Sequence, residues 1–109
     1  LRQRGKLEKF SSLDIYFLCF NETATQEAIM YSENLKEHFP DLNIKINLGL
    51  ESASSQFKKA DKSNARMALI LGEDELNNDK ISYKDLRTKS DQESLTFQDL
   101  LIKLKQLYK

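Results

Sequence analysis

The sequence predicts an α/β fold, a mixed sheet of about five strands with about three helices. Two nearly continuous apolar stretches, residues 13–20 and 67–71, have the pattern of strands that are covered on both faces. Between them lie two segments with apolar residues at helical spacing, residues 23–39 and 53–60, and one alternating segment, residues 43–48. The order strand, helix, strand, helix, strand implies parallel pairing with right-handed crossovers.

The first helix is expected to open at Thr23, because Thr23-x-x-Gln26 matches a capping box. Pro40 closes this helix, since proline cannot continue the hydrogen-bond ladder. One buried stripe is expected along the helix, formed by Ala24, Ala28, Tyr31, Leu35 and Phe39.

The second strand alternates in polarity, which is typical of a half-exposed strand near a sheet edge. Its apolar face is expected to carry Ile44, Ile46 and Leu48. Its polar face is expected to carry Asn43, Lys45 and Asn47. The helix that follows has a short apolar stripe, formed by Ala53, Phe57 and Ala60.

After Gly72 the pattern changes from alternating strands and helices to short strands joined by turns. Residues 77–80 are a turn signal, so residues 81–86 are expected to form a short strand antiparallel to its neighbour. Residues 93–96 are a candidate fifth strand. Thr96-x-x-Asp99 resembles a capping box that opens the last helix. The apolar stripe of that helix is formed by Phe97, Leu100, Leu101, Leu104 and Leu107.

Composition limits the classes of function. The chain has 109 residues, the length of one domain, and its 17 basic and 17 acidic side chains cancel, so any basic surface must be local. Cys19 is the only cysteine, which excludes an internal disulfide and is expected as a small core residue. No apolar run approaches the roughly 18 residues that span a bilayer. Residues 1–12 are basic and weakly patterned, and we expect a linker or the tail of a preceding domain there.

An acidic cluster, residues 73–75, follows a buried strand at its carboxyl end, where open α/β sheets form their sites. Glu73 and Glu75 are candidates for acid–base catalysis, and residues 73–79 are oxygen-rich but lack the spacing of a calcium loop. His38 is expected as a solvated residue near a helix end. The sequence has no G-x-S-x-G, Walker or G-x-G-x-x-G motif. These observations favour recognition over catalysis.

A carboxylate accepts hydrogen bonds only, and the Watson–Crick edge of guanine presents two adjacent donors. Single-stranded RNA loops expose such edges, so Glu73 and Glu75 are candidates for reading guanine. Nearby cations must then supply the attraction to phosphate. The candidates, each of which is also consistent with a solvated surface, are Lys58, Lys59, Lys62, Arg66, Lys84 and Arg87.

Several motifs recur at the spacing of a known family. They are Ala60-Asp61-Lys62, Asn64-Ala65-Arg66, Gly72-Glu73-Asp74-Glu75 and Tyr83-Lys84-Asp85-Leu86-Arg87, with the apolar strand at residues 67–71 between them. Together they resemble the C-terminal anticodon-binding domain of bacterial histidyl-tRNA synthetases, and the resemblance covers about residues 13–109. The sequence departs from the family at Ser52–Ser55, where glycines and lysines are common, and at Asn64, where glycine is usual.

The resemblance implies a five-stranded mixed sheet with three helices, shared with the threonyl, prolyl and glycyl enzymes of class II. It implies binding to a tRNA anticodon, which is GUG for histidine. By similarity to the threonyl enzyme, Glu75 and Lys84 would contact anticodon bases, with Glu73 and Arg66 as companions. The tRNA backbone would be held by Lys58, Lys59, Lys62 and Arg87.

For a parent chain, the resemblance implies attachment of histidine to tRNA(His) with ATP and magnesium in a separate catalytic domain. This segment would hold no catalytic site, cofactor or metal. The implied partners are the tRNA(His) anticodon loop, the chain's own catalytic domain and a second copy in a homodimer, with no membrane or DNA, in the cytoplasm. Two alternatives remain. One is a protein-interaction or subunit-packing module of the same fold, and the other is the anticodon-binding domain of a threonyl, prolyl or glycyl enzyme.

Overall fold

A computed structural model describes residues 13–49, 51–88 and 92–108. Within them, one sheet contains the strands β1 (Ile15–Cys19), β2 (Ile44–Ile46), β3 (Met67–Leu71), β4 (Ile81–Asp85) and β5 (Glu93–Leu95). The helices are α1 (Glu22–His38), α2 (Ala53–Lys62), α3 (Glu73–Asn77) and α4 (Phe97–Leu107). The expected α/β class and five-stranded mixed sheet are confirmed, and α3 is a helix that the sequence did not predict.

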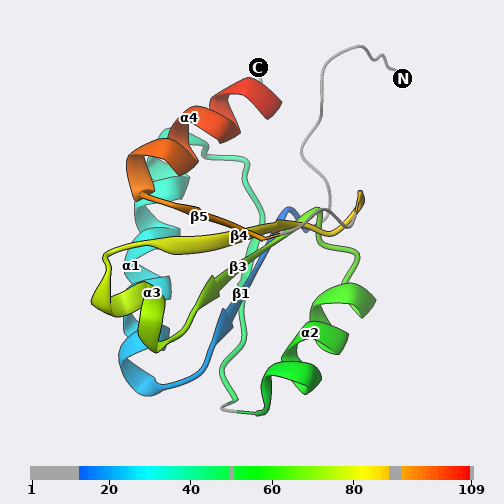
Figure 1. Cartoon of the computed structure of the whole chain (residues 1–109). Coiled ribbons are helices and arrows are strands. Elements are labelled where there is room, and N and C mark those ends of the chain that lie inside the picture. Colours follow the sequence, from blue (N-terminus) through cyan, green and yellow to red (C-terminus); the bar gives the residue numbers. More distant parts are fainter. Residues whose placement is uncertain (1–12, 50, 89–91, 109) are drawn as a thin grey trace.

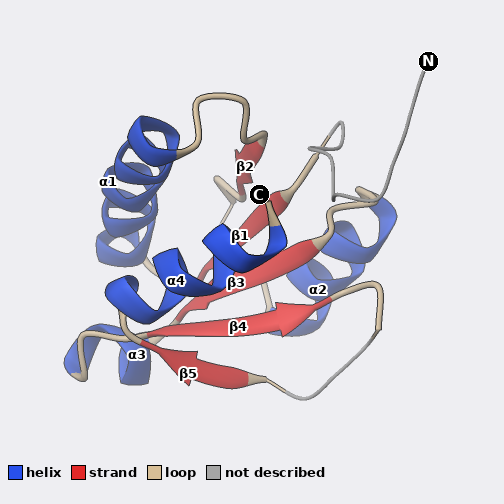
Figure 2. Cartoon of the chain, turned by 90° about the horizontal axis from the view of Figure 1, so that it is seen from above, coloured by secondary structure: helices blue, strands red, loops and turns tan. Residues whose placement is uncertain are grey.

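The strands lie in the order β2-β1-β3-β4-β5, which Figure 2 shows from one edge of the sheet to the other. β1 is parallel to both β2 and β3, whereas β4 is antiparallel to β3 and to β5. All five residues of β1 and of β3 are buried. The prediction that these two strands are central, adjacent and parallel is therefore confirmed, as is the edge position of β2.

Helices cover both faces of the sheet, α1 and α4 on one side and α2 on the other (Figure 1). Alternate residues of β1 belong to the two cores: Ile15, Phe17 and Cys19 pack in the core on the α1 and α4 side. Tyr16 and Leu18 pack in the core with Ala60 of α2. This double covering explains why β1 and β3 are apolar without interruption.

The N-cap of the first helix lies two residues earlier than predicted. Asn21 is its N-cap, with an extended backbone and a side-chain oxygen that accepts from the Ala24 amide at 2.7 Å. Thr23 lies inside the helix, so the expected capping box is wrong. Asparagine is among the preferred N-cap residues, and Asn21 satisfies a free amide of the first turn.

The alternation predicted for the second strand fails after Ile46. Leu48 is 74% exposed, whereas Asn47 is 4% exposed and points inward. Asn47 can be buried because its side-chain oxygen accepts a hydrogen bond from the Tyr16 hydroxyl at 2.8 Å. This bond replaces the hydrogen bond to water that an exposed asparagine would make. The strand ends where this side chain turns in.

The second helix buries a residue that the sequence did not single out. Gln56 is fully buried beside Ala60, Phe57 is half-buried, and Ala53 is exposed, so the predicted stripe is wrong at Ala53. The stripe of α4 is confirmed: Leu100, Leu101 and Leu104 are buried, and its two ends are half-buried. The ring of Phe97 stacks on Tyr31 of α1, which joins the two helices on that face.

Candidate nucleic-acid interface

The acidic cluster is the first turn of α3, which begins directly at the carboxyl end of β3. Glu73, Asp74 and Glu75 lie at its N-terminal end, where negative side chains stabilise a helix through its dipole. Glu73 and Asp74 are exposed, whereas Glu75 is half-buried. The cluster therefore has a local structural role, and Glu75 alone turns back toward the sheet.

Both carboxylate oxygens of Glu75 are held by hydrogen bonds within the chain. Its Oε1 atom accepts from the Gly72 amide at 2.8 Å, and its Oε2 atom accepts from the Ser82 hydroxyl at 2.8 Å. A Cβ atom at Gly72 would lie 2.9 Å from Oε1, so glycine leaves room for this contact. Each carboxylate oxygen has two lone pairs, so Glu75 is a fixed acceptor with capacity for further donors.

A polar surface lies beside Glu75 on the α2 side of the sheet. Ala68 and Ile70 pack toward α2, and they pair directly with Lys84 and Ser82 of β4. Ser82 in turn pairs with Ser94 of β5. Directly opposed residues of a sheet share a face, so these three polar side chains lie on the same face as α2. We call Ser82, Lys84 and Ser94 the β4–β5 shelf.

One end of the shelf lies next to the carboxylate of Glu75, and the other end carries Lys84 beside the ring of Phe57. Glu75 reaches it through Ser82, and Lys84 is two residues further along β4, on the same face. The Lys84 ammonium lies 5.3 Å from the centre of the Phe57 ring of α2, a cation–π contact. The structure thus brings Glu75 and Lys84 together on one surface, with an aromatic side chain beside them.

A polar hollow of about 260 Å³ adjoins the acidic end of the shelf. It is lined by Asp74, Glu75, Asn78, Lys80 and Ser94. Acceptors, a cation and an amide therefore surround one small space between α3 and β5, where a polar ring or phosphate-bearing group can be contacted from several sides.

Arg66 lies at the opposite end of the sheet from Glu75. It immediately precedes β3, is 9% exposed, and its guanidinium lies 5.6 Å from the centre of the Tyr108 ring. Arg87 is exposed and follows β4, where its amide donates to the Asp85 carboxylate. The structure does not bring Arg66 to the acidic cluster. Of the two cations predicted to accompany Glu75, Lys84 lies nearer to it along the sheet than Arg66 does.

The three predicted lysines of α2 do not all share one face of the helix. All are exposed. Lys59 and Lys62 face a hollow beside β2, and Lys58 does not line it. Lys59 forms an ion pair with Glu51. Hydrogen bonds from Asn47 and then from Lys59 lower the pKa of the Glu51 carboxyl to about 2.

Phe57 and Ser94 are part of this surface, to which Ser82, only 6% exposed, contributes through its hydrogen bond to Glu75, and none of the three was predicted as a site residue. Alternation in residues 81–85 was a usable signal, because Ile81 and Tyr83 are buried on the α4 side and the residues between them must face the other way. The spacing of Phe57 in the sequence indicates only an apolar stripe. Among the described residues, no helix can span a membrane, and no three His, Cys, Asp or Glu side chains are grouped to hold a metal ion.

This architecture is that of the anticodon-binding domains of aminoacyl-tRNA synthetases. The RNA binding domain of threonyl-tRNA synthetase from Cryptosporidium parvum Iowa II has the same fold, with a TM-score of 0.80 at 17% identity over 90% of this chain and 24% of that chain. The family model described as the anticodon binding domain matches residues 14–107. The chain therefore belongs to the anticodon-binding-domain family.

Two further relatives are tRNA synthetases specific for histidine. The histidine–tRNA ligase of Hydrogenovibrio crunogenus is 40% identical over 92 residues, which are 84% of this chain and 22% of that protein. The crystal structure of histidyl-tRNA synthetase from Nostoc sp. PCC 7120 matches with a TM-score of 0.76 at 25% identity, over 88% of this chain and 22% of that chain. The chain spans less than a quarter of the length of these relatives, and the resemblance seen in the motifs is confirmed.

Proposed function

We propose that this chain recognises a tRNA anticodon as the anticodon-binding domain of a histidine–tRNA ligase. The similarity to the Hydrogenovibrio enzyme supports the histidine assignment. The observation that carries the mechanism is the placement of Glu75, fixed by Gly72 and Ser82 on the surface that also holds Lys84. The anticodon of tRNA(His), GUG, would be the RNA element that meets this surface.

Glu75 would read guanine by accepting from its N1–H and N2 amine. Its two internal hydrogen bonds hold the carboxylate in place, so little side-chain freedom is lost when the base binds. The same carboxylate repels the acceptor atoms of uracil and of adenine N1. It is therefore a specificity device rather than a source of affinity.

Lys84 and Phe57 would supply the attraction at the same surface. The ammonium of Lys84 can meet a phosphate or a base acceptor, and an aromatic ring such as Phe57 suits stacking with an unpaired base. Glu73 is exposed at the start of α3 and is a second candidate for base contact, whereas Arg66 is distant from both. Lys58, Lys59, Lys62 and Arg87 remain candidates for the tRNA backbone.

The parent protein would attach histidine to tRNA(His) in the cytoplasm, with ATP and magnesium bound by a catalytic domain and with two copies in a homodimer. A subunit-packing module would instead need an apolar surface at the end of the sheet. The shelf and the adjoining hollow are polar and charged, which favours RNA recognition.

The test is the base preference of the Glu75→Gln variant. Glutamine also completes a capping box, and its amide can donate to Ser82, so the fold is retained. One of the two contacts with guanine then becomes donor against donor, which should cost about 1–3 kcal/mol, or roughly ten- to a hundredfold in discrimination. Affinities of this chain for a GUG stem-loop and its single-base variants are measured at fixed salt.

The matched control is Glu37→Gln, which removes the same charge from an exposed position on α1. We expect this control to keep the base preference of the wild type. If the Glu75→Gln variant also ranks the stem-loops as the wild type does, Glu75 serves only to cap α3 and the proposed role is wrong.

A further inference from the structure

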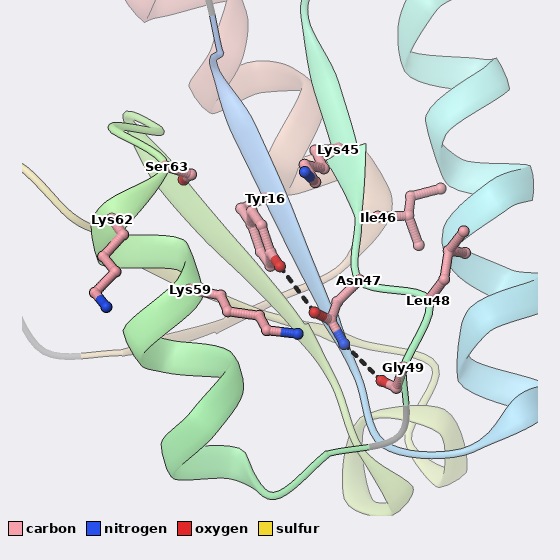
Figure 3. A pocket seen from close by; sticks show the side chains of 9 residues that line it. All are labelled: Tyr16, Lys45, Ile46, Asn47, Leu48, Gly49, Lys59, Lys62 and Ser63. Atoms are coloured by element: carbon pink, nitrogen blue, oxygen red, sulfur yellow. Dashed lines mark hydrogen bonds between the residues drawn. The ribbon is translucent and has the colours of Figure 1, made fainter.

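A second hollow, of about 480 Å³, lies between α2 and the edge strand β2. Figure 3 shows it with Lys45 and Asn47 on the β2 side and Lys59 and Lys62 on α2. Because α2 lies between this hollow and the β4–β5 shelf, the two surfaces are separate. The base-reading role proposed for the shelf does not involve it.

The hollow is lined by lysines that come from two elements. Lys59 and Lys62 are three residues apart on α2 and therefore share a face of that helix. Lys45, the middle residue of β2, approaches from the opposite wall and is exposed. Among the described residues, neither Lys45 nor Lys62 has an ion-pair partner, and the lining contains no acidic side chain.

The base of the hollow is polar but neutral. The Tyr16 hydroxyl donates to Asn47 Oδ1 at 2.8 Å, and both residues are nearly fully buried. The Asn47 amide donates in turn to the Gly49 carbonyl and to Glu51 Oε1. These groups already have partners, so the capacity for a ligand lies in the ammonium groups, each of which has three donors.

Glu51 limits how much of this positive charge is available. It lies just outside the lining, and its Oε2 atom forms the ion pair with Lys59. Its Oε1 atom accepts a hydrogen bond from the Asn47 amide. An anion entering the hollow would share Lys59 with this carboxylate and would meet its repulsion. Glu51 thus acts as an internal competitor for the same cation.

We propose that this hollow binds a phosphate group through Lys45, Lys59 and Lys62. Phosphate suits the arrangement because it carries several acceptor oxygens that flexible ammonium groups can approach from opposite walls. The phosphate is either a phosphodiester of the RNA backbone or a free phosphate compound. The RNA source rests on the function proposed above, whereas the free source does not.

The experiment follows backbone amide shifts by NMR at constant ionic strength, with inorganic pyrophosphate, a GUG stem-loop and the same stem with a scrambled loop as probes. We expect saturable shifts at Lys45, Asn47 and Ser63 that both RNA stems produce equally, because phosphate contacts carry no base information. Saturation by pyrophosphate identifies a free-phosphate site, and saturation by the stems alone identifies a backbone site. Absence of saturable shifts there with every probe would overturn the proposal.

Variants provide a second readout. Lys45→Gln and Lys62→Gln should each weaken binding about three- to tenfold, and each should reduce the salt slope by about one when RNA is the ligand. Glu51→Gln should strengthen binding by a similar factor, because it releases Lys59. The control, Lys105→Gln, removes an exposed lysine from α4 and should change nothing.

The two proposals fail in different ways. Unchanged affinity and salt slope in the Lys45→Gln and Glu51→Gln variants would refute the phosphate site and leave base reading by Glu75 intact. Loss of base preference on mutating Glu75, with these lysine effects present, supports both roles.

Discussion

At the end of β1, the side chain of Gln56 makes the backbone hydrogen bonds that a residue of a neighbouring strand would otherwise make. The β2 ladder ends with the Asn47 amide donating to the Phe17 carbonyl, so Cys19 has no strand partner on that side. The fully buried side chain of Gln56 provides one. Its Oε1 atom accepts from the Cys19 amide at 3.0 Å, and its Nε2 atom donates to the Cys19 carbonyl at 2.9 Å and to the Glu51 carbonyl at 3.0 Å.

The Gln56→Met substitution keeps the length and approximate volume of this side chain but removes its amide. Three hydrogen bonds are lost, at about 0.5–1.5 kcal/mol each, and two buried backbone groups of Cys19 are left unpaired, at about 1–3 kcal/mol for such a group. The lost hydrogen bonds and the unpaired backbone groups partly describe the same loss, so the two terms are not simply added. We expect the free energy of unfolding to fall by about 3–5 kcal/mol. That is a large part of the roughly 5–15 kcal/mol that stabilises a domain.

Urea unfolding gives the change in the free energy of unfolding, and hydrogen exchange gives the protection of the Cys19 amide. We expect both to fall in the Gln56→Met variant. Gln98→Met, on the exposed face of α4, is the matched control and should change stability by less than about 0.5 kcal/mol. A loss below 1 kcal/mol for Gln56→Met, with the Cys19 amide still protected, would show that Gln56 does not substitute for a strand.

Three further predictions concern a cap, buried ionisable groups and Gly72. Asn21→Ala should lower the free energy of unfolding by about 1 kcal/mol in urea titrations, because the first turn of α1 loses its side-chain acceptor. Burial raises the pKa of the Cys19 thiol to about 11 and that of Tyr83 to about 12. Both groups ionise first in the unfolded chain, so their contribution to stability should be constant below about pH 9 and should be lost between about pH 9 and 12. Cys19 accounts for up to about 3 kcal/mol of this loss, which Cys19→Ala should remove from pH-dependent unfolding curves. Gly72→Ala puts a Cβ atom 2.9 Å from Glu75 Oε1, so stem-loop titrations should show a weaker preference for guanine.

Elements with a strong local signal were predictable from the sequence. β1 and β3 are apolar at every position because helices cover both faces, and the stripe of α4 is regular because one side meets the sheet. The buried positions of Asn47 and Gln56 were not predictable in this way. Their partners, Tyr16 and Cys19, lie 31 and 37 residues away in the sequence, and a polar residue gives no local sign of such a contact.

For the candidate site, the sequence pattern singles out Glu75 and Lys84 but does not show which side chains lie around them. Glu75 and Lys84 were placed on one surface by the antiparallel register of β3 and β4, which pairs Lys84 with Ala68. The same register leaves Arg66 at the far end, which spacing along the chain does not reveal. α3 was missed because five residues without an apolar stripe give little helical signal, although the acidic first turn was present.

Both edges of the sheet are strands of three residues, β2 and β5. A strand this short exposes few free backbone groups to another chain, and a central lysine, Lys45, keeps the β2 edge charged and hydrated. Edge-to-edge growth into a larger sheet, the first step of many aggregation pathways, is therefore disfavoured at both ends. A domain that must stay dispersed while it meets a charged polymer gains from this, because its associations are left to side chains rather than to backbone pairing.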